Sequence, residues 1–166
     1  HIDLIERASV EEVYAYIEED LNDAIANLPL KGEYAAPDLG RATRGAAQAL
    51  LAKVYLYQRK WQEAADMANI VINSGEYGLE PDYATVWRAS TENGIESVFE
   101  LQGRGEIIAH GIQQYSTTQG VRGPDGFGGG FNTPSEDLLN AFESEGDDIR
   151  RDATIIFRGE TLFDGR

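Results

Sequence analysis

The chain has no cysteine, only two histidines (His1 and His110), and 14 basic residues against 29 acidic ones. The lack of cysteine excludes disulfides, thiolate zinc sites and cysteine nucleophiles for this sequence. With so few histidines, histidine metal clusters and Ser-His-Asp triads have little support. The net charge of −15 argues against a nucleic-acid partner, because phosphates need a basic surface, and it is unfavourable for docking on anionic lipid.

Long apolar runs and catalytic motifs are also missing. No apolar stretch approaches the length that spans a membrane. The glycine-rich GFGGGF at 126–131 neither follows a strand nor opens a helix, as a dinucleotide fingerprint requires. The acidic turn 143–148, together with Asp152, offers calcium oxygens, but it lacks the register of an EF-hand and is better explained as a solvated turn. We expect no enzyme activity, no cofactor and no metal site.

The length of 166 residues favours one domain. The chain begins at His1 without an initiator methionine, and it ends soon after an apolar stretch. We therefore expect an internal part of one larger domain, truncated at both ends. Its expected parts are helical over 1–75, a strand with a glycine-rich excursion over 76–132, and a capped helix with a strand over 133–166.

The N-terminal part has the pattern of an amphipathic helix. Ser9 and Glu12 form a capping box, and the helix is expected to run to about Leu28 before Pro29. Apolar residues recur at spacings of three and four, and the other face is acidic. Because the stretch 41–60 holds five basic residues and no acids, pairing between the two segments is plausible.

Residues 40–79 predict two close-packed antiparallel helices. Thr43 can cap the first helix, Trp61 opens the second, and Gly75 is a left-handed stop. The small and large residues are spaced like a tetratricopeptide repeat, with Tyr55 and Trp61 expected in the core. Arg59 stands where such a repeat usually turns on glycine. The fold class is therefore mainly α.

The C-terminal half is less regular. ESVFELQ at 96–102 alternates like a half-buried strand, and Trp87 is expected to pack. Thr133, with Pro134 at the first helical position, predicts a capped helix to about Phe142. A strand is expected over 153–157, and the arginines at 150 and 151 are expected to pair with the acids of 143–148.

Taken together, these strings resemble the SusD/RagB family of outer-membrane nutrient-binding lipoproteins. The resemblance rests on their order along the chain: SVEEVYAYIEEDLNDAIANLP, GRATRGAAQALLAKVYLYQRKWQEAADMANIVINSGEYGL, ESVFELQ and NTPSEDLLNAFESEGDDIRRDATII. It implies a tetratricopeptide-like helical superhelix with a few short strands and long irregular loops. It also implies a cell-surface protein anchored through an N-terminal lipid, which captures glycans for a SusC-like TonB-dependent transporter. The signal peptide and the lipid-attachment cysteine are not in this sequence.

Glycan binding needs flat aromatic faces and planar polar groups on loops held by a rigid scaffold. The glycine-rich stretch 104–132, where family members would differ by ligand, supplies both. The candidate ligand-binding residues are Gln114, Tyr115, Arg122, Phe127 and Phe131. The alternative is a structural loop whose aromatics plug into the helical body.

Two other functions compete with glycan capture. A tetratricopeptide adaptor without glycan binding would need further repeats, and residues 76–166 show none. A glycoside hydrolase would need two facing carboxylates, and in a chain so rich in acids such pairs arise by chance. The noncatalytic glycan-binding protein remains the leading hypothesis.

Overall fold

The computed structural model of the chain describes residues 6–103, 117–122 and 128–161. Helices account for its regular structure, and the described residues contain no strand, so the mainly α fold is confirmed. In chain order the elements are α1 (Val10–Asn27), η1 (Lys31–Glu33), η2 (Ala36–Asp38), α2 (Arg44–Tyr57), α3 (Trp61–Ile72), η3 (Tyr83–Thr85), η4 (Ala89–Thr91), α5 (Glu136–Glu145) and α6 (Asp148–Thr154).

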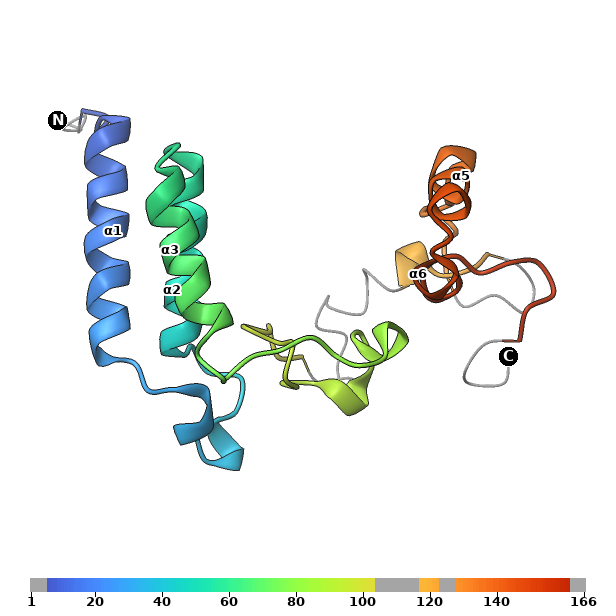
Figure 1. Ribbon diagram of the computed structural model, residues 1–166, viewed down its shortest axis with the longest axis horizontal. Helices are drawn as coiled ribbons and strands as arrows, with labels where there is room; N and C mark the ends of the chain where they lie inside the picture. Colours follow the sequence, from blue (N-terminus) through green and yellow to red (C-terminus); the bar gives the residue numbers. More distant parts are fainter. Residues whose placement is uncertain (1–5, 104–116, 123–127, 162–166) are drawn as a thin grey trace, which may run out of the picture. The chain divides into compact units, whose positions relative to one another are not determined.

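The chain forms two compact units. The first comprises His1–Glu80 and Ala89–Leu101, and the second comprises Pro81–Arg88 and Gln102–Arg166. The helices α1, α2 and α3 belong to the first unit, whereas α5 and α6 belong to the second (Figure 1).

The helix α1 begins at the predicted capping box. Ser9 Oγ accepts a hydrogen bond from the Glu12 amide at 3.1 Å, and the Glu12 carboxylate accepts one from the Ser9 amide at 2.8 Å. The apolar stripe of α1 is half-buried from Ile17 onward, whereas Val10 and Val13 are 65% and 47% exposed. Because α1 has 18 residues and α2 only 14, the first turns of α1 extend beyond the helix that covers the rest.

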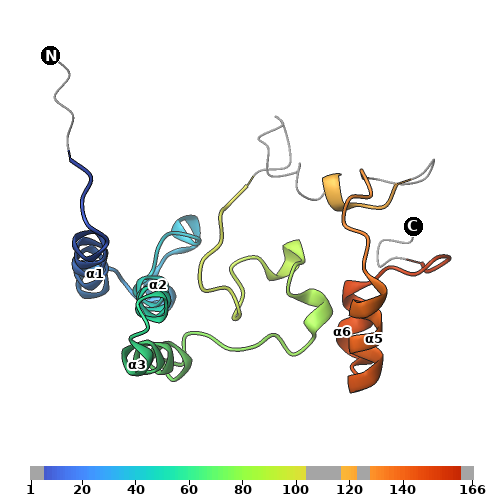
Figure 2. The ribbon, with the colours of Figure 1, turned by 90° about the horizontal axis from the view of Figure 1, so that it is seen from above.

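The core of the first unit lies between α2 and its neighbours. Figures 1 and 2 show α1, α2 and α3 side by side, with α2 packed against both of the others. Thr43 caps α2 as predicted, because its Oγ1 accepts from the Ala46 amide at 3.1 Å. Leu51 is fully buried, and the other buried apolar residues of this unit are Ala47, Val54, Ala64 and Val71.

The turn between α2 and α3 has the conformation that glycine usually supplies. Arg59 has a φ of +62°, in the left-handed region that a residue with a Cβ enters at some cost. Its amide donates to the Leu56 carbonyl at 3.0 Å, which closes the last turn of α2. The antiparallel helix pair forms as predicted, and Gly75, with φ of +77°, lies just beyond the end of α3.

Both tryptophans are exposed, so the prediction that they pack is wrong. Trp61 is 61% exposed and Trp87 is 88% exposed, while Tyr55 is half-buried beneath the Lys60 ammonium, 5.4 Å from its ring centre. Trp61 lies on α3, whose main partner among the described helices is α2. Among the described residues, no further helix packs on the side of α3 that carries Trp61, so its ring stays exposed.

The two predicted strands do not form. Residues 96–102 have no regular structure, and Phe99 and Leu101 are 61% and 80% exposed. Alternation alone cannot make a strand, because its backbone groups need a neighbouring strand. Residues 153 and 154 end α6 instead, since Asp147 caps that helix by accepting from the Arg150 amide at 3.2 Å.

The helix α5 begins two residues later than predicted. Ser135 is the cap, because its Oγ accepts from the Leu138 amide at 3.2 Å, and Pro134 precedes it instead of opening the helix. The helix continues past Phe142 to Glu145 and ends at Gly146, which has a φ of +67°. Ser135 serves as the cap in place of the predicted Thr133, because its hydroxyl accepts from a helix amide and the acidic residues after it suit the first turn of a helix.

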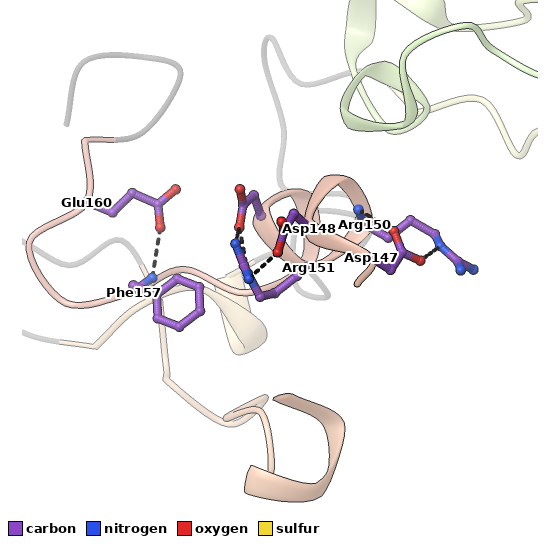
Figure 3. A network of polar contacts seen from close by, with 7 residues as sticks. Asp147, Asp148, Arg150, Arg151, Phe157 and Glu160 are labelled. Atoms are coloured by element: carbon purple, nitrogen blue, oxygen red, sulfur yellow. Dashed lines mark hydrogen bonds and ion pairs between the residues drawn. The ribbon is translucent and has the colours of Figure 1, made fainter. Parts of the chain in front are cut away.

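The arginines of α6 pair with nearby acids, as predicted (Figure 3). Arg150 forms an ion pair with Asp147, and Arg151 contacts Asp148 at 2.5 Å and Asp152 at 2.7 Å. These carboxylates raise the pKa of Arg151, mainly through the hydrogen bond from Asp152. Two acids of the turn 143–148, Asp147 and Asp148, are thus paired with arginines of α6.

Tyr77, Gly94 and Ser97 are fastened to η1 and to the start of α2. Lys31 Nζ donates to the carbonyls of Gly94 at 2.5 Å and Ser97 at 2.8 Å, and it lies 5.2 Å from the ring centre of Tyr77. The Tyr77 hydroxyl is 2.8 Å from Thr43 Oγ1. Burial lowers the pKa of Lys31, which the carboxylates of Glu100 and Glu76 partly offset.

Candidate ligand-binding cleft

Residues 117–121 and the glycine-rich residues 128–131 of the second unit pair through their backbones. The hydrogen bonds run from Gly129 to Thr117 at 2.7 Å, from Gly130 to Gly120 at 2.8 Å, from Gly128 to Val121 at 3.0 Å and from Phe131 to Thr118 at 3.2 Å, each from amide to carbonyl. A Cβ on Gly128 would lie 2.4 Å from the Gly120 Cα, so only glycine allows this approach. Gly130 has a φ of +67°, which also favours glycine.

A cleft of about 460 Å³ lies beside these paired segments. That volume is within the ~300–1,000 Å³ typical of small-molecule sites. Its lining comes from three stretches of the second unit: Gln119, Gly120, Val121 and Arg122, then Gly130, Asn132, Thr133 and Pro134, and finally Thr154 and Ile156.

The lining combines planar amides, hydroxyls and apolar surface. Asn132 Nδ2 donates to Gln119 Oε1 at 3.1 Å, so the two amides orient each other across the cleft wall. Two threonines add hydroxyl groups, and the apolar lining comes from Val121, Pro134 and Ile156. Such a mixture suits a ligand with many hydroxyls and apolar C–H faces.

An arginine and an exposed aromatic ring stand together at this cleft. The Arg122 guanidinium carbon lies 5.7 Å from the centre of the Phe131 ring, and Arg122 Nε donates to the Gly129 carbonyl at 2.9 Å. Phe131 is 75% exposed. The guanidinium is thus fixed on one side by the backbone and supported by the ring, a cation–π arrangement.

The structure describes two of the five predicted ligand-binding residues, and all five remain predictions as ligand contacts. Arg122 lines the cleft, and Phe131 stands between two of its lining residues with its ring beside Arg122. Gln114, Tyr115 and Phe127 lie outside the described residues and remain predictions. The sequence did not suggest Thr154 or Ile156, because they reach the cleft by a tertiary contact. The sequence signal that could have indicated them is the apolar run around Ile155. The side chain of Ile155 is only 4% exposed and anchors the segment that carries both residues.

A second cavity is far smaller than this cleft. It lies in the first unit, between Lys31, Tyr34 and Phe99, and measures about 20 Å³, room for about one water molecule. Across residues 6–103, 117–122 and 128–161, no group of three or more histidines and carboxylates is arranged to hold a metal ion. No helix in this part of the chain is long and apolar enough to cross a bilayer.

Comparison with known proteins gives one consistent family. Residues 3–56 match the family model SusD-like_3, described as "Starch-binding associating with outer membrane". The SusD-like protein P2 of Formosa agariphila is 34% identical over 128 residues, which is 74% of this chain and 25% of that protein. A SusD-like protein of Bacteroides ovatus is 29% identical over 90% of this chain and 29% of its own length.

Solved structures agree with the sequence relatives. A laminarin-binding SusD-like protein is similar with a TM-score of 0.74 and 31% identity, over 90% of this chain and 36% of that one. A SusD-like protein from Bacteroides fragilis gives 0.67 and 28%, over 82% of this chain and 27% of that one. The chain spans between a fifth and a third of the length of the curated relatives it matches. On this evidence the chain belongs to the SusD/RagB family of SusD-like proteins.

Proposed function

We propose that the chain is part of a noncatalytic cell-surface protein that captures oligosaccharides for a SusC-like TonB-dependent transporter. The observation that carries the proposal is the cleft of about 460 Å³, whose wall combines paired amides, hydroxyls and apolar surface next to an exposed aromatic ring. The family description and the laminarin-binding relative support a glycan as the ligand.

The cleft matches the amphiphilic surface of a sugar. Carbohydrate C–H faces stack on aromatic rings, and the Phe131 ring is 75% exposed. Sugar hydroxyls donate and accept hydrogen bonds, and the amides of Gln119 and Asn132 do both. A rigid backbone lowers the entropy cost of binding, and the glycine pairing holds these groups on fixed segments.

The transporter and the lipid anchor belong to the same proposal and rest on the family resemblance. A family described as associating with the outer membrane fits a protein held at that membrane. Co-purification of the protein with a SusC-like transporter from the same outer membrane tests the partnership. Recovery of the transporter with the protein would support capture for import, and its absence under gentle extraction would contradict it.

Isothermal titration with laminarin oligosaccharides tests the glycan site directly. We expect Phe131→Ala to weaken binding about tenfold, because the stacking surface is lost. Tyr57→Ala is the matched control, since Tyr57 is 68% exposed but lies on α2 in the first unit. Equal loss in both variants, or no binding of any glycan in a broad panel, would contradict the site. Release of reducing ends during incubation would point to a hydrolase instead.

A further inference from the structure

The guanidinium of Arg122 is held by one hydrogen bond and one aromatic ring. Its Nε donates to Gly129, and its planar face lies near Phe131. Within the described residues, neither terminal Nη group has a hydrogen-bond or ion-pair partner. An arginine fixed in this way presents two parallel N–H donors, the geometry that binds two oxygens of one anion.

The arginines of α6 differ from Arg122 in that each is paired with a carboxylate. Arg150 pairs with Asp147 through its Nε, and the two Nη groups of Arg151 pair with Asp148 and Asp152 (Figure 3). Arg122 is the one charged residue among the described residues that line the cleft. In a chain of net charge −15, the cleft wall therefore carries a positive charge with no acid beside it in the described lining.

We propose that this cleft prefers glycans with an anionic substituent, which the two Nη groups of Arg122 bind end-on. The substituent is a uronic acid carboxylate or a sulfate ester, since both offer two oxygens with the required spacing. A positively charged amino sugar would be repelled by the same group. This inference rests on the proposed glycan-binding function and names the ligand class of the same site.

The test compares ligands of matched length that differ in charge. Titration uses neutral laminarin oligosaccharides, the same oligosaccharides carrying sulfate, and an oligouronate. We expect the wild-type protein to bind at least one anionic set about tenfold more tightly than the neutral set at low salt, because hydrogen bonds to charged groups are the stronger ones. The sulfated and uronate arms show which anion the site takes. The advantage should shrink as sodium chloride is added.

Two substitutions at Arg122 and one elsewhere separate the causes. Arg122→Gln should abolish the anionic preference, and Arg122→Lys should keep part of it, because lysine retains charge but not the fork. Arg158→Gln is the matched control, since it removes the same charge from an exposed residue of the same unit outside the cleft lining. It should leave the preference intact.

The outcomes distinguish the two proposals. Equal affinity for neutral and anionic ligands would overturn the anionic preference and leave glycan binding standing. No binding of any set would overturn the proposed function itself. If Arg122→Gln also loses the neutral ligands, the salt dependence of binding by the wild-type protein tests the anionic preference by itself. A preference for anionic ligands that persists unchanged at high salt would contradict an ionic contact.

Discussion

Gly45 lies where α2 has no room for a side chain. A Cβ built on it would be 2.4 Å from Tyr77 Cε2, and the Tyr77 hydroxyl is 2.8 Å from Thr43 Oγ1. Because Thr43 also caps α2, the tyrosine cannot withdraw without disturbing the start of the helix. This contact joins the helical repeat to the segment that follows it.

We therefore expect Gly45→Ala to lower the free energy of unfolding by about 1–3 kcal/mol, the usual cost of overpacking. The loss should appear even though alanine favours a helix interior by about 1 kcal/mol over glycine. Urea unfolding measures it, with Gly32→Ala as control, because that Cβ meets only Glu76 oxygens at 3.7 Å or more. In a Tyr77→Ala background, Gly45→Ala should become stabilising; equal destabilisation in both backgrounds would disprove the steric explanation.

Lys31 gives a second prediction at this scale. It donates to two carbonyls of the segment 76–101, and methionine would keep its length but none of its donors. We expect Lys31→Met to speed hydrogen exchange of the amides in 93–98, by the equivalent of about 1–3 kcal/mol, while α2 and α3 keep their protection. Lys53→Met is the control, because Lys53 only lies over the Tyr57 ring at 5.9 Å. Unchanged exchange in 93–98 would show that the lysine does not anchor the segment.

Between elements, one carboxylate of α1 meets the turn that joins α2 and α3. Glu18 Oε1 accepts from Lys60 Nζ at 2.5 Å and from Gln58 Nε2 at 2.6 Å, so the expected pairing of the acidic and basic segments is present at this point. The hydrogen bond from Lys60 is the main reason that the pKa of Glu18 lies below its usual value, and the same contact raises the pKa of Lys60.

The pH dependence follows from these directions. Since the pKa of Glu18 is lower in the folded state, its stabilisation is complete above the unfolded pKa and is lost as pH falls through the folded one. We expect Glu18→Gln to lower the free energy of unfolding at neutral pH, by less than about 1 kcal/mol for this partly exposed pair. The difference from wild type should vanish at acidic pH. Glu19→Gln, on the exposed side of α1, should show no such pattern, and a difference that persists in acid would contradict the ionic origin.

Local sequence patterns predicted the helices well. Features that depend on distant parts of the chain were predicted poorly. The starts of α1 and α2 were predictable because Ser9 and Thr43 bond to amides three residues away. The strand expected at 96–102 was wrong because its alternation says nothing about a partner strand. The cap of α6 was not predicted, because an aspartate at position 147 is as typical of a polar turn as of a helix cap.

At the scale of the whole molecule, the sequence predicted only part of the cleft lining. The glycine-rich composition indicated a loop that approaches something closely, and Arg122 does line the cleft. Two other lining residues, Thr154 and Ile156, come from a later part of the chain and reach the cleft only through folding. No local pattern contains that information.

Both tryptophans of the chain are exposed, which gives a whole-molecule prediction. We expect acrylamide to quench the fluorescence of the native chain nearly as strongly as that of the unfolded chain. The variant that keeps only Trp87 should be quenched more than the one that keeps only Trp61, because their exposures are 88% and 61%. Strong protection of either tryptophan would show that it is buried in solution.

The division of the chain into two units has a practical consequence for protein engineering. The chain leaves the first unit after Glu80, returns at Ala89, and leaves again after Leu101. A single protease cut after Leu101 would therefore not separate the two units, because Pro81–Arg88 of the second unit would stay attached to the helical repeat of the first. To transfer the cleft to a different scaffold, the eight residues Pro81–Arg88 must be added as a separate insertion. A single contiguous segment that contains the whole second unit would also include Ala89–Leu101 of the first unit.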